Sequence, residues 1–374
     1  MSKHDVSLKT VIKFAGAFTA FLIGSGFATG QEVLQYFASY GYLGVLGAIL
    51  TLLLLTYVGV SFLTVGQREN FDKGSDIYRY YCGNKLGTFF DYFSTFFCFL
   101  SFTVMISGAG ATLNQHYGLS VYIGGILMAV LALITVIMGL NKIVDIIGKI
   151  GPVIVIISIL LGLVAIFQNF SNLSPSIVDN SLKSLDSQGT LIKASTNWIF
   201  AAFSYVGFCM LWLAGFLAAM GTQAQNKKEA AIGGALGATS FSIAVIVVAL
   251  GLLSCINTVA GSQIPMLHLA RNIHPVLATV FAIIIMAGIY TTSVPLLWNV
   301  SSRFTKDESK NFKILTAVLV VIGTIIGLLL PFAKLINIVY VINGYVGVGL
   351  LIIMFIRSII RIFKNKSSIE EQVK

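Results

Sequence analysis

Glycine and serine residues interrupt the first long apolar stretch of the chain. The run Phe21-Leu22-Ile23 leads into Gly24-Ser25-Gly26 and continues as Phe27-Ala28-Thr29-Gly30-Gln31-Glu32. Each glycine costs a helix about 1 kcal/mol relative to alanine, so this pattern predicts a helix break. The freed amide and carbonyl groups would have to line a cavity, and the amides at the start of the new helix would suit a carboxylate. The alternative is a small-residue face for helix packing, and spacing alone leaves both readings open.

A second interruption is predicted halfway along the chain, where an aromatic run carries a serine and a glycine. Its sequence is Phe203-Ser204-Tyr205-Val206-Gly207-Phe208. Two breaks at matching positions are typical of the substrate site in secondary transporters. The aromatic rings would wall a ligand pocket, although core packing is the more frequent role of any single aromatic residue.

One acidic residue stands apart from the other acids of the chain. Of the 14 acidic residues, only Glu32 lies well inside a predicted membrane span. A charged group there costs about 2.5–3.5 kcal/mol on insertion scales, which makes it a candidate for function. Glu32 would accept a proton, attract a cationic group of the substrate or take part in an outer gate. The alternative is a carboxylate hydrated at the helix end.

The sequence shows none of the residue patterns that mark enzymes. It has no intramembrane His/Asp cluster, no Ser–Lys pair, no zinc-ligand spacing and no phosphate-binding loop. The four cysteines have no paired spacing and indicate neither a disulfide framework nor a metal site. We therefore expect that the protein is not an enzyme and carries no cofactor.

The composition indicates an all-α integral membrane protein. Hydrophobic residues make up 57% of the 374 residues and charged residues only 10%, whereas soluble domains carry roughly a quarter charged residues. A bilayer core needs about 20 apolar residues per helix. Ten spans meet this requirement: 11–38, 42–66, 88–114, 119–139, 142–168, 195–221, 229–253, 272–302, 312–330 and 333–356.

The distribution of lysine and arginine predicts the orientation. With the N-terminus inside, 20 of the 24 basic residues fall in cytoplasmic segments, including the basic tail 357–374. Both termini are therefore expected in the cytoplasm. The net charge of +10 is explained by topology and requires no nucleic-acid partner.

The ten spans divide into two blocks of five. The blocks 11–168 and 195–356 flank an extracellular loop at 169–194 within one transmembrane domain, 1–374. Because five is an odd number, the second block must enter the membrane with the opposite orientation. This 5+5 inverted repeat, with discontinuous helices 1 and 6, is the plan of many secondary transporters.

Several motifs resemble known transporters. The run Ile23-Gly24-Ser25-Gly26-Phe27 resembles the unwound first helix of the amino acid–polyamine–organocation superfamily, whose members share the LeuT fold. The longer run from Gly24 to Glu32 resembles the YkvI-type bacterial membrane proteins. The segment 141–150 is similar to one in branched-chain amino acid:cation symporters. The layout covers nearly the whole chain, which lacks the two additional C-terminal helices of many relatives.

This resemblance implies a central substrate site between helices 1, 3, 6, 8 and 10, with alternating access. The amides around Gly24, Ser25 and Gly26 would hold the substrate carboxylate. Phe203, Ser204 and Tyr205 would contact its side chain or cap the pocket.

The resemblance also implies a coupling ion. In sodium-coupled relatives the ion lies between carbonyls of helix 1, here those of Ala20 and Ile23, and a small residue of helix 8 followed three positions later by two hydroxyl residues. The helix 8 sequence fits this pattern as Gly288, Thr291 and Thr292, or one position later as Ile289, Thr292 and Ser293. The alternative is that these hydroxyls bond back to their own helix.

Some proton-coupled relatives carry a helix 5 lysine in place of sodium, and Lys149 is the corresponding candidate here. The alternative is an interfacial lysine whose ammonium reaches the headgroups. Lys149 keeps proton coupling open, with sodium favoured.

We expect a monomeric secondary transporter in the lipid of the bacterial plasma membrane, taking up a small amino acid or amine with a cation. A non-transporting amino-acid receptor on the same fold, resembling the membrane subunit of spore germinant receptors, is the alternative. A channel would require an oligomeric selectivity ring that the sequence does not show.

Overall fold

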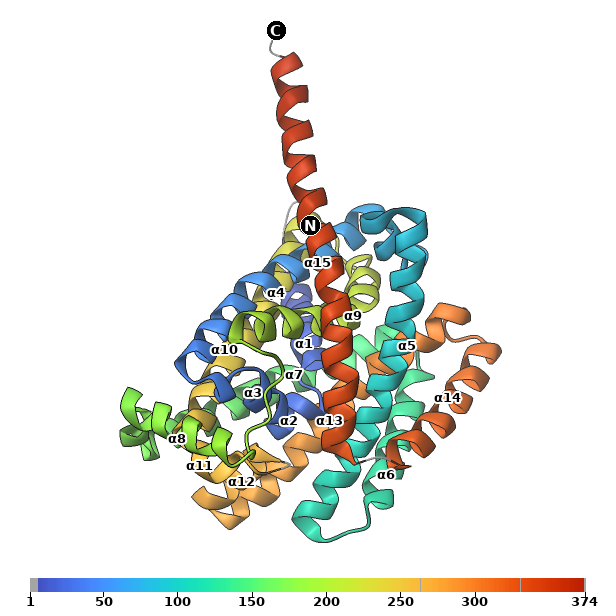
Figure 1. Ribbon diagram of the computed structural model, residues 1–374. Helices are drawn as coiled ribbons and strands as arrows, with labels where there is room; N and C mark the ends of the chain where they lie inside the picture. The colour runs from blue at the N-terminus through green and yellow to red at the C-terminus, as the bar shows by residue number, and fades with distance from the viewer. Residues whose placement is uncertain (1–5, 263, 330, 373–374) are drawn as a thin grey trace.

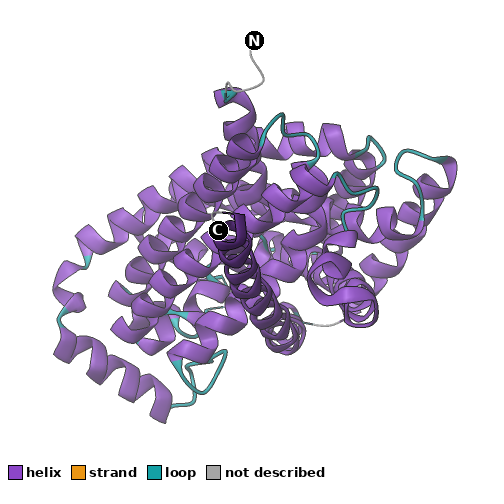
Figure 2. Ribbon diagram, turned by 90° about the horizontal axis from the view of Figure 1, so that it is seen from above, coloured by secondary structure: helices purple, strands orange, loops and turns teal. Residues whose placement is uncertain are grey.

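The fold is a bundle of helices. The computed structural model describes residues 6–262, 264–329 and 331–372, and in these segments Figure 2 shows helices joined by loops and turns, without a strand. The first half contains α1 (Leu8–Leu22), α2 (Ser25–Thr29), α3 (Gln31–Tyr36), η1 (Ala38–Tyr40), α4 (Tyr42–Glu69), α5 (Asp76–Tyr117), α6 (Val121–Val136) and α7 (Leu140–Gln168). The second half contains η2 (Phe170–Leu173), α8 (Pro175–Ser187), α9 (Trp198–Gly221), α10 (Lys227–Ser254), α11 (Ile256–Val259), α12 (Pro265–Ile273), α13 (Pro275–Phe304), α14 (Lys310–Leu329) and α15 (Phe332–Gln372).

The helices agree with the ten predicted spans. By length and composition, eight helices of the described residues could cross a membrane: α4, α5, α7, α9, α10, α13, α14 and α15. The other two spans are the shorter apolar helix α6 and the interrupted segment α1–α2–α3. Five spans precede the connecting segment with α8 and five follow it. The predicted ten-helix, 5+5 architecture is therefore confirmed.

Several boundaries differ from those predicted. Helix α5 begins at Asp76, ahead of the predicted span, because a short helical stretch joins it across Gly83, whose φ of 71° marks a kink. Helix α15 continues to Gln372, so the basic tail extends a helix that rises above the bundle in Figure 1. The predicted loop at 169–194 contains α8, which begins at Pro175; proline is favoured as the first residue of a helix.

The predicted break in the sixth membrane span, which is α9, is wrong. Helix α9 runs without interruption through the stretch 203–208. A Cβ atom on Gly207 would lie 2.1 Å from the carbonyl oxygen of Gly344, and one on Gly347 would lie 2.0 Å from that of Gly207. The glycine therefore allows close backbone contact between α9 and α15, which is the small-residue packing of membrane helices.

Close approach between glycines also fixes the first helix. A Cβ atom on Gly16 would lie 2.2 Å from the carbonyl oxygen of Gly148 on α7. Helix α1 packs on α7 and α10, α13 packs on α5, and α15 packs on α9. Peripheral helices such as α14, at one edge of Figure 1, expose apolar side chains including Ile314, Val321 and Ile325, as expected for contact with lipid.

Candidate functional site

The first helix breaks where the sequence predicts. Helix α1 ends at Leu22, Ile23 has φ −81° and ψ 59°, and Gly24 is extended before α2 begins at Ser25. The amide of Ser25 donates to Met105 Sδ at 3.2 Å, a weak acceptor. A Cβ atom on Gly24 would lie 2.9 Å from Met105 Cε, so a larger residue would disturb this contact. The break is therefore confirmed and is built against α5.

A second change of direction follows one turn later. Gly30 has φ 83°, in the left-handed region that glycine favours, and separates α2 from α3. A Cβ atom on Gly30 would lie 2.7 Å from Met266 Cγ of α12. The segment 23–36 is thus two short helical pieces, with α12 packed against their junction.

Helix α3 places Glu32 inside the protein. Its side chain is fully buried, which does not agree with a carboxylate hydrated at a helix end. Oε2 accepts a long hydrogen bond of 3.5 Å from the Tyr205 hydroxyl, and Oε1 has no hydrogen-bond partner among the described residues. A Cβ atom on Gly26 would lie 1.8 Å from Oε1, so the carboxyl group packs directly on the backbone of α2.

A group of packed aromatic rings includes Tyr205, whose hydroxyl reaches this carboxyl group. Tyr205 contacts Tyr36 with ring centroids 5.3 Å apart and Phe208 with centroids 4.9 Å apart. Phe208 stacks on Tyr340 of α15 at 5.0 Å. We call Glu32, Tyr36, Tyr205, Phe208 and Tyr340 the Glu32 cluster.

Several hydroxyl groups of the cluster and its neighbours are buried without a well-formed hydrogen bond. The Tyr36 hydroxyl faces Ser204, and the Tyr340 hydroxyl faces Ser25, yet neither pair has the geometry of a hydrogen bond. Buried polar groups are nearly always paired, so an accumulation of unpaired ones indicates a site for a ligand or water.

The structure brings most of the predicted substrate residues together. Gly24, Ser25 and Gly26 lie at the break, and Tyr205 contacts Glu32. Ser204 is buried facing Tyr36. Phe203 is only half-buried and contributes no ring contact to the cluster.

The hydroxyl residues predicted for the eighth membrane span lie on α13, against the end of α1. Thr291 Oγ1 donates to Ala20 O at 2.9 Å and to Gly288 O at 2.9 Å. Thr292 Oγ1 donates to Phe21 O at 2.6 Å and lies 3.3 Å from Ala20 O. A Cβ atom on Gly288 would lie 3.0 Å from Ile23 O. All five residues predicted for sodium, Ala20, Ile23, Gly288, Thr291 and Thr292, therefore meet at the break.

The hydrogen bonds of α13 distinguish the two ways in which its sequence could match the sodium-site pattern. Ser293 Oγ donates back to Ile289 O of its own helix at 2.7 Å, whereas Thr291 and Thr292 reach α1. The first register, with Gly288, is the one that faces the break. The oxygens gathered there fit a hard cation, which prefers carbonyl and hydroxyl ligands.

Lys149 does not join this site. Its side chain is exposed on α7, and the residues of α7 that pack on α1 are Gly148 and Gly151. Nearby, Lys13 pairs with Asp145 at 2.7 Å. The exposed position agrees with an interfacial lysine.

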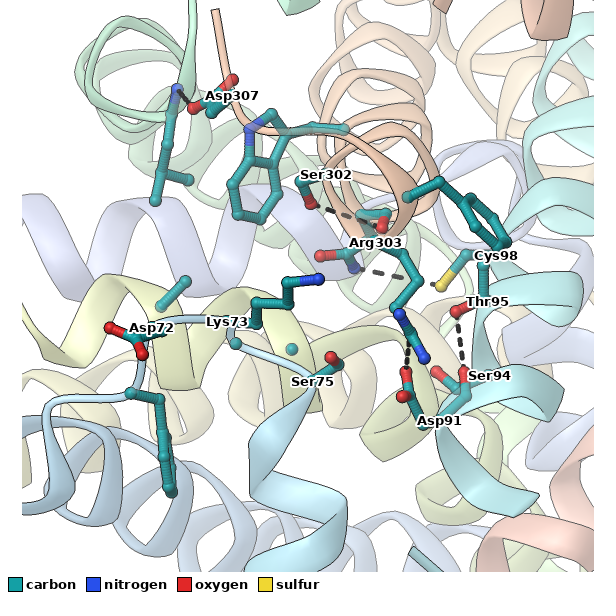
Figure 3. A pocket seen from close by; sticks show the side chains of 18 of the residues that line it. Asp72, Lys73, Ser75, Asp91, Ser94, Thr95, Cys98, Ser302, Arg303 and Asp307 are labelled. Atoms are coloured by element: carbon teal, nitrogen blue, oxygen red, sulfur yellow. Dashed lines mark hydrogen bonds and ion pairs between the residues drawn. The ribbon is translucent and has the colours of Figure 1, made fainter. Parts of the chain in front are cut away.

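A cavity of about 690 Å³ opens between the start of α5, the end of α9 and the end of α13. Figure 3 shows Arg303 directed at Asp91 beside Ser94, while Lys73 extends into the space. Arg303 Nε donates to Asp91 Oδ1 at 2.6 Å, with Asp91 1% and Arg303 12% exposed. Arg79 lies 3.7 Å from the other oxygen of Asp91. Asp91 falls near the start of the predicted span 88–114, and no feature of the sequence pointed to its pairing with Arg303.

Trp212 contacts both the Glu32 cluster and a residue that lines this cavity. Its indole Nε1 donates to Ser101 Oγ at 2.8 Å, and its ring packs on Tyr340 at 5.2 Å. Its carbonyl oxygen accepts from Asn299 Nδ2 at 3.1 Å, and Asn299 lines the cavity.

The sequence did not single out Tyr36, Trp212 or Tyr340, and it named Phe208 only as part of the predicted aromatic run 203–208. A usable signal existed for α9, because Tyr205, Phe208 and Trp212 recur at helical spacing and share one face. Tyr340 lies far along the chain, and only the packing of α15 on α9 brings it to the cluster.

Comparison with known proteins identifies the fold. No protein-family profile matches the chain. The crystal structure of MhsT in complex with L-phenylalanine superposes with a TM-score of 0.64 at 15% identity, covering 91% of this chain and 87% of MhsT. The chain has the LeuT fold. Mhp1, a nucleobase-cation-symport-1 family transporter captured with bromovinylhydantoin, gives a TM-score of 0.50 at 12% identity over 85% of this chain and 70% of Mhp1.

A sequence relative supports the predicted branch. The uncharacterized membrane protein YkvI of Bacillus subtilis (strain 168) is 22% identical over 344 residues, which are 90% of this chain and 93% of YkvI. The resemblance to LeuT-fold and YkvI-type proteins is therefore confirmed. These relatives are described as membrane proteins or transporters and not as enzymes, in agreement with the sequence.

Proposed function

We propose that this protein is a secondary active transporter that takes up a small amino acid or related amine together with a cation, with sodium favoured over a proton. The observation that carries the proposal is the break after α1. The hydroxyls of Thr291 and Thr292 on α13 lie on one side of it, and buried polar groups without hydrogen-bond partners lie on the other. The LeuT fold supports it, because discontinuous helices of such folds form the sites for substrate and ion.

The proposed ion site follows from the oxygens at the break. A sodium ion would be held by the carbonyls of Ala20 and Ile23, the carbonyl of Gly288 and the hydroxyls of Thr291 and Thr292. The two hydroxyls now donate to carbonyls of α1. A sodium ion would be coordinated by lone pairs of both the carbonyl and the hydroxyl oxygens. Because these oxygens come from α1 and α13, binding would draw the two helices together.

The proposed substrate site lies on the other side of the break. The hydroxyl of Ser25 is buried without a hydrogen-bond partner among the described residues, and a substrate carboxylate would supply one. The amide of Ser25 would exchange its weak bond to Met105 Sδ for the same carboxylate. Ser204 and Tyr205 would contact the rest of the molecule.

Alternating access would use the cavity beneath Trp212. With the orientation expected from the basic residues, the loops that line this cavity are cytoplasmic and α12 lies on the outer side. The structure then corresponds to a state closed outside and hollowed inside, and substrate release would require Trp212 to move away from Tyr340.

The test is uptake of radiolabelled amino acids and amines into proteoliposomes, scored together with binding to the same preparation. Transport of a bound compound supports the proposal. Binding without uptake would favour a receptor, and flux that no gradient alters would favour a channel.

A further inference from the structure

Glu32 is a buried carboxyl group without a cation. None of the ion pairs found among the described residues includes it, although it is fully buried. The other two deeply buried acids are compensated: Asp91 pairs with Arg303, and Glu229 accepts the amides of Ser7 and Gln225 at 2.9 and 2.8 Å. A buried carboxylate that lacks such partners is costly, so the ionised form of Glu32 would need a positive charge supplied from outside the chain.

The surroundings of Glu32 favour an organic cation over a metal ion. The Tyr205 hydroxyl reaches the carboxyl group, and the Tyr205 ring is packed with those of Tyr36, Phe208 and Tyr340, whose faces would attract an ammonium group. A metal ion would need several converging strong ligands, and the described residues contain no group of three or more His, Cys, Asp or Glu side chains placed to hold one. The nearby hydroxyls of Tyr36, Tyr340 and Ser204 are free to accept from an N–H donor.

We propose that the Glu32 cluster binds the ammonium group of a small monocationic amine, and that such amines are the preferred substrate class. This inference rests on the proposed transport function and narrows it from amino acids and amines to amines. Net charge distinguishes the two classes of substrate. An ammonium neutralises the carboxylate, whereas a zwitterionic amino acid adds no net charge and brings a second carboxylate into the same buried space.

Three probes of matched chain length separate the possibilities. Butylamine carries the ammonium alone, norvaline carries the ammonium and a carboxylate, and pentanoate carries the carboxylate alone. Binding is measured by calorimetry on the full chain in lipid nanodiscs with sodium present. The expected order is butylamine tightest, norvaline at least about tenfold weaker because its carboxylate lies near that of Glu32, and pentanoate without binding.

Variants locate the binding. Glu32→Gln keeps the shape and is expected to weaken butylamine binding on the order of 100-fold, because the ammonium loses its buried charge partner. Glu229→Gln changes a second fully buried carboxyl away from the cluster and is expected to leave binding unchanged. If Glu32→Gln does not fold, Phe208→Leu removes one ring and is expected to weaken butylamine binding several-fold, as loss of a cation–π contact would.

The outcomes distinguish the two proposals. Norvaline binding as tight as butylamine binding, insensitive to Glu32→Gln and accompanied by norvaline uptake, would overturn the amine site and leave the transporter intact. Butylamine binding that depends on Glu32 without uptake of any probe would support the site and refute transport. Binding that Glu32→Gln and Glu229→Gln weaken equally would also overturn the assignment.

Discussion

Single residues at the break show why glycine is required there. Gly26 lies under the Glu32 carboxyl group, with room for a hydrogen but not for a methyl group. The contact ties a backbone position of α2 to the side chain that we propose binds the ammonium. Gly24 has a similar relation to Met105 and Thr292.

Gly26→Ala should displace Glu32 and destabilise the protein. The new Cβ would fall 1.8 Å from Oε1, and overpacking of this kind costs about 1–3 kcal/mol. We expect a lower melting temperature and weaker amine binding. Gly261→Ala is the matched control, since its nearest neighbour would be 3.5 Å away; its change should stay within about 0.5 kcal/mol. Equal melting temperatures for both variants would refute the contact.

At the scale of helices, glycine has two different roles, and sequence spacing did not separate them. In helix 1, Gly24 and Gly30 mark real interruptions, while in α9 Gly207 lets two unbroken helices approach. The difference depends on the partner surface, here Gly344 on α15, which local sequence does not reveal.

The Gly207 contact can be tested by adding one methyl group. A Cβ atom there would meet a backbone oxygen that cannot move aside, so Gly207→Ala should cost about 1–3 kcal/mol and loosen α15 from α9. On the same helix, Gly215→Ala would find its nearest neighbour at 3.6 Å and should be nearly neutral. Thermal denaturation in detergent compares the two, and a flexible break at Gly207 would instead make its variant neutral.

The ion pair between α5 and α13 is the clearest electrostatic link between elements. Removing one partner of a buried pair leaves an uncompensated charge and costs about 3–5 kcal/mol. Asp91→Asn should therefore destabilise the protein strongly, whereas Arg79→Met, which removes a 3.7 Å contact from a more exposed arginine, should cost less than about 1 kcal/mol.

A double-mutant cycle completes this prediction. Asp91→Asn combined with Arg303→Met removes both charges, and its cost should be clearly smaller than the sum of the two single changes. Additive costs measured by chemical denaturation would show that the two residues do not stabilise each other.

Much of the helical architecture could be predicted because apolar length and glycine interruptions are local properties. The ten spans, the break at Gly24 and the meeting of Thr291 and Thr292 with α1 were all accessible from sequence or resemblance. Tyr340 and the Asp91–Arg303 pair were not, because each depends on contacts between distant helices.

For the whole molecule, the expected orientation makes a direct prediction about its two faces. In a background with the four native cysteines replaced, Ser187→Cys on the segment after α7 should react with a membrane-impermeant maleimide in intact cells. Asp72→Cys, at the cavity rim, should react only after the membrane is opened, because its loop is expected in the cytoplasm. The opposite pattern would invert the topology and assign the cavity to the outer face.

The central claim for the whole molecule is that the break in α1 couples a cation to the movement of substrate. The most direct measurement is accumulation of labelled butylamine and norvaline in proteoliposomes with and without an inward sodium gradient. We predict accumulation of at least one of them above equilibrium only with the gradient, abolished in Thr292→Ala and retained in Ser293→Ala, whose hydroxyl bonds its own helix. Sodium-driven accumulation that persists unchanged in Thr292→Ala, or no gradient-driven accumulation in the wild type, would contradict the account.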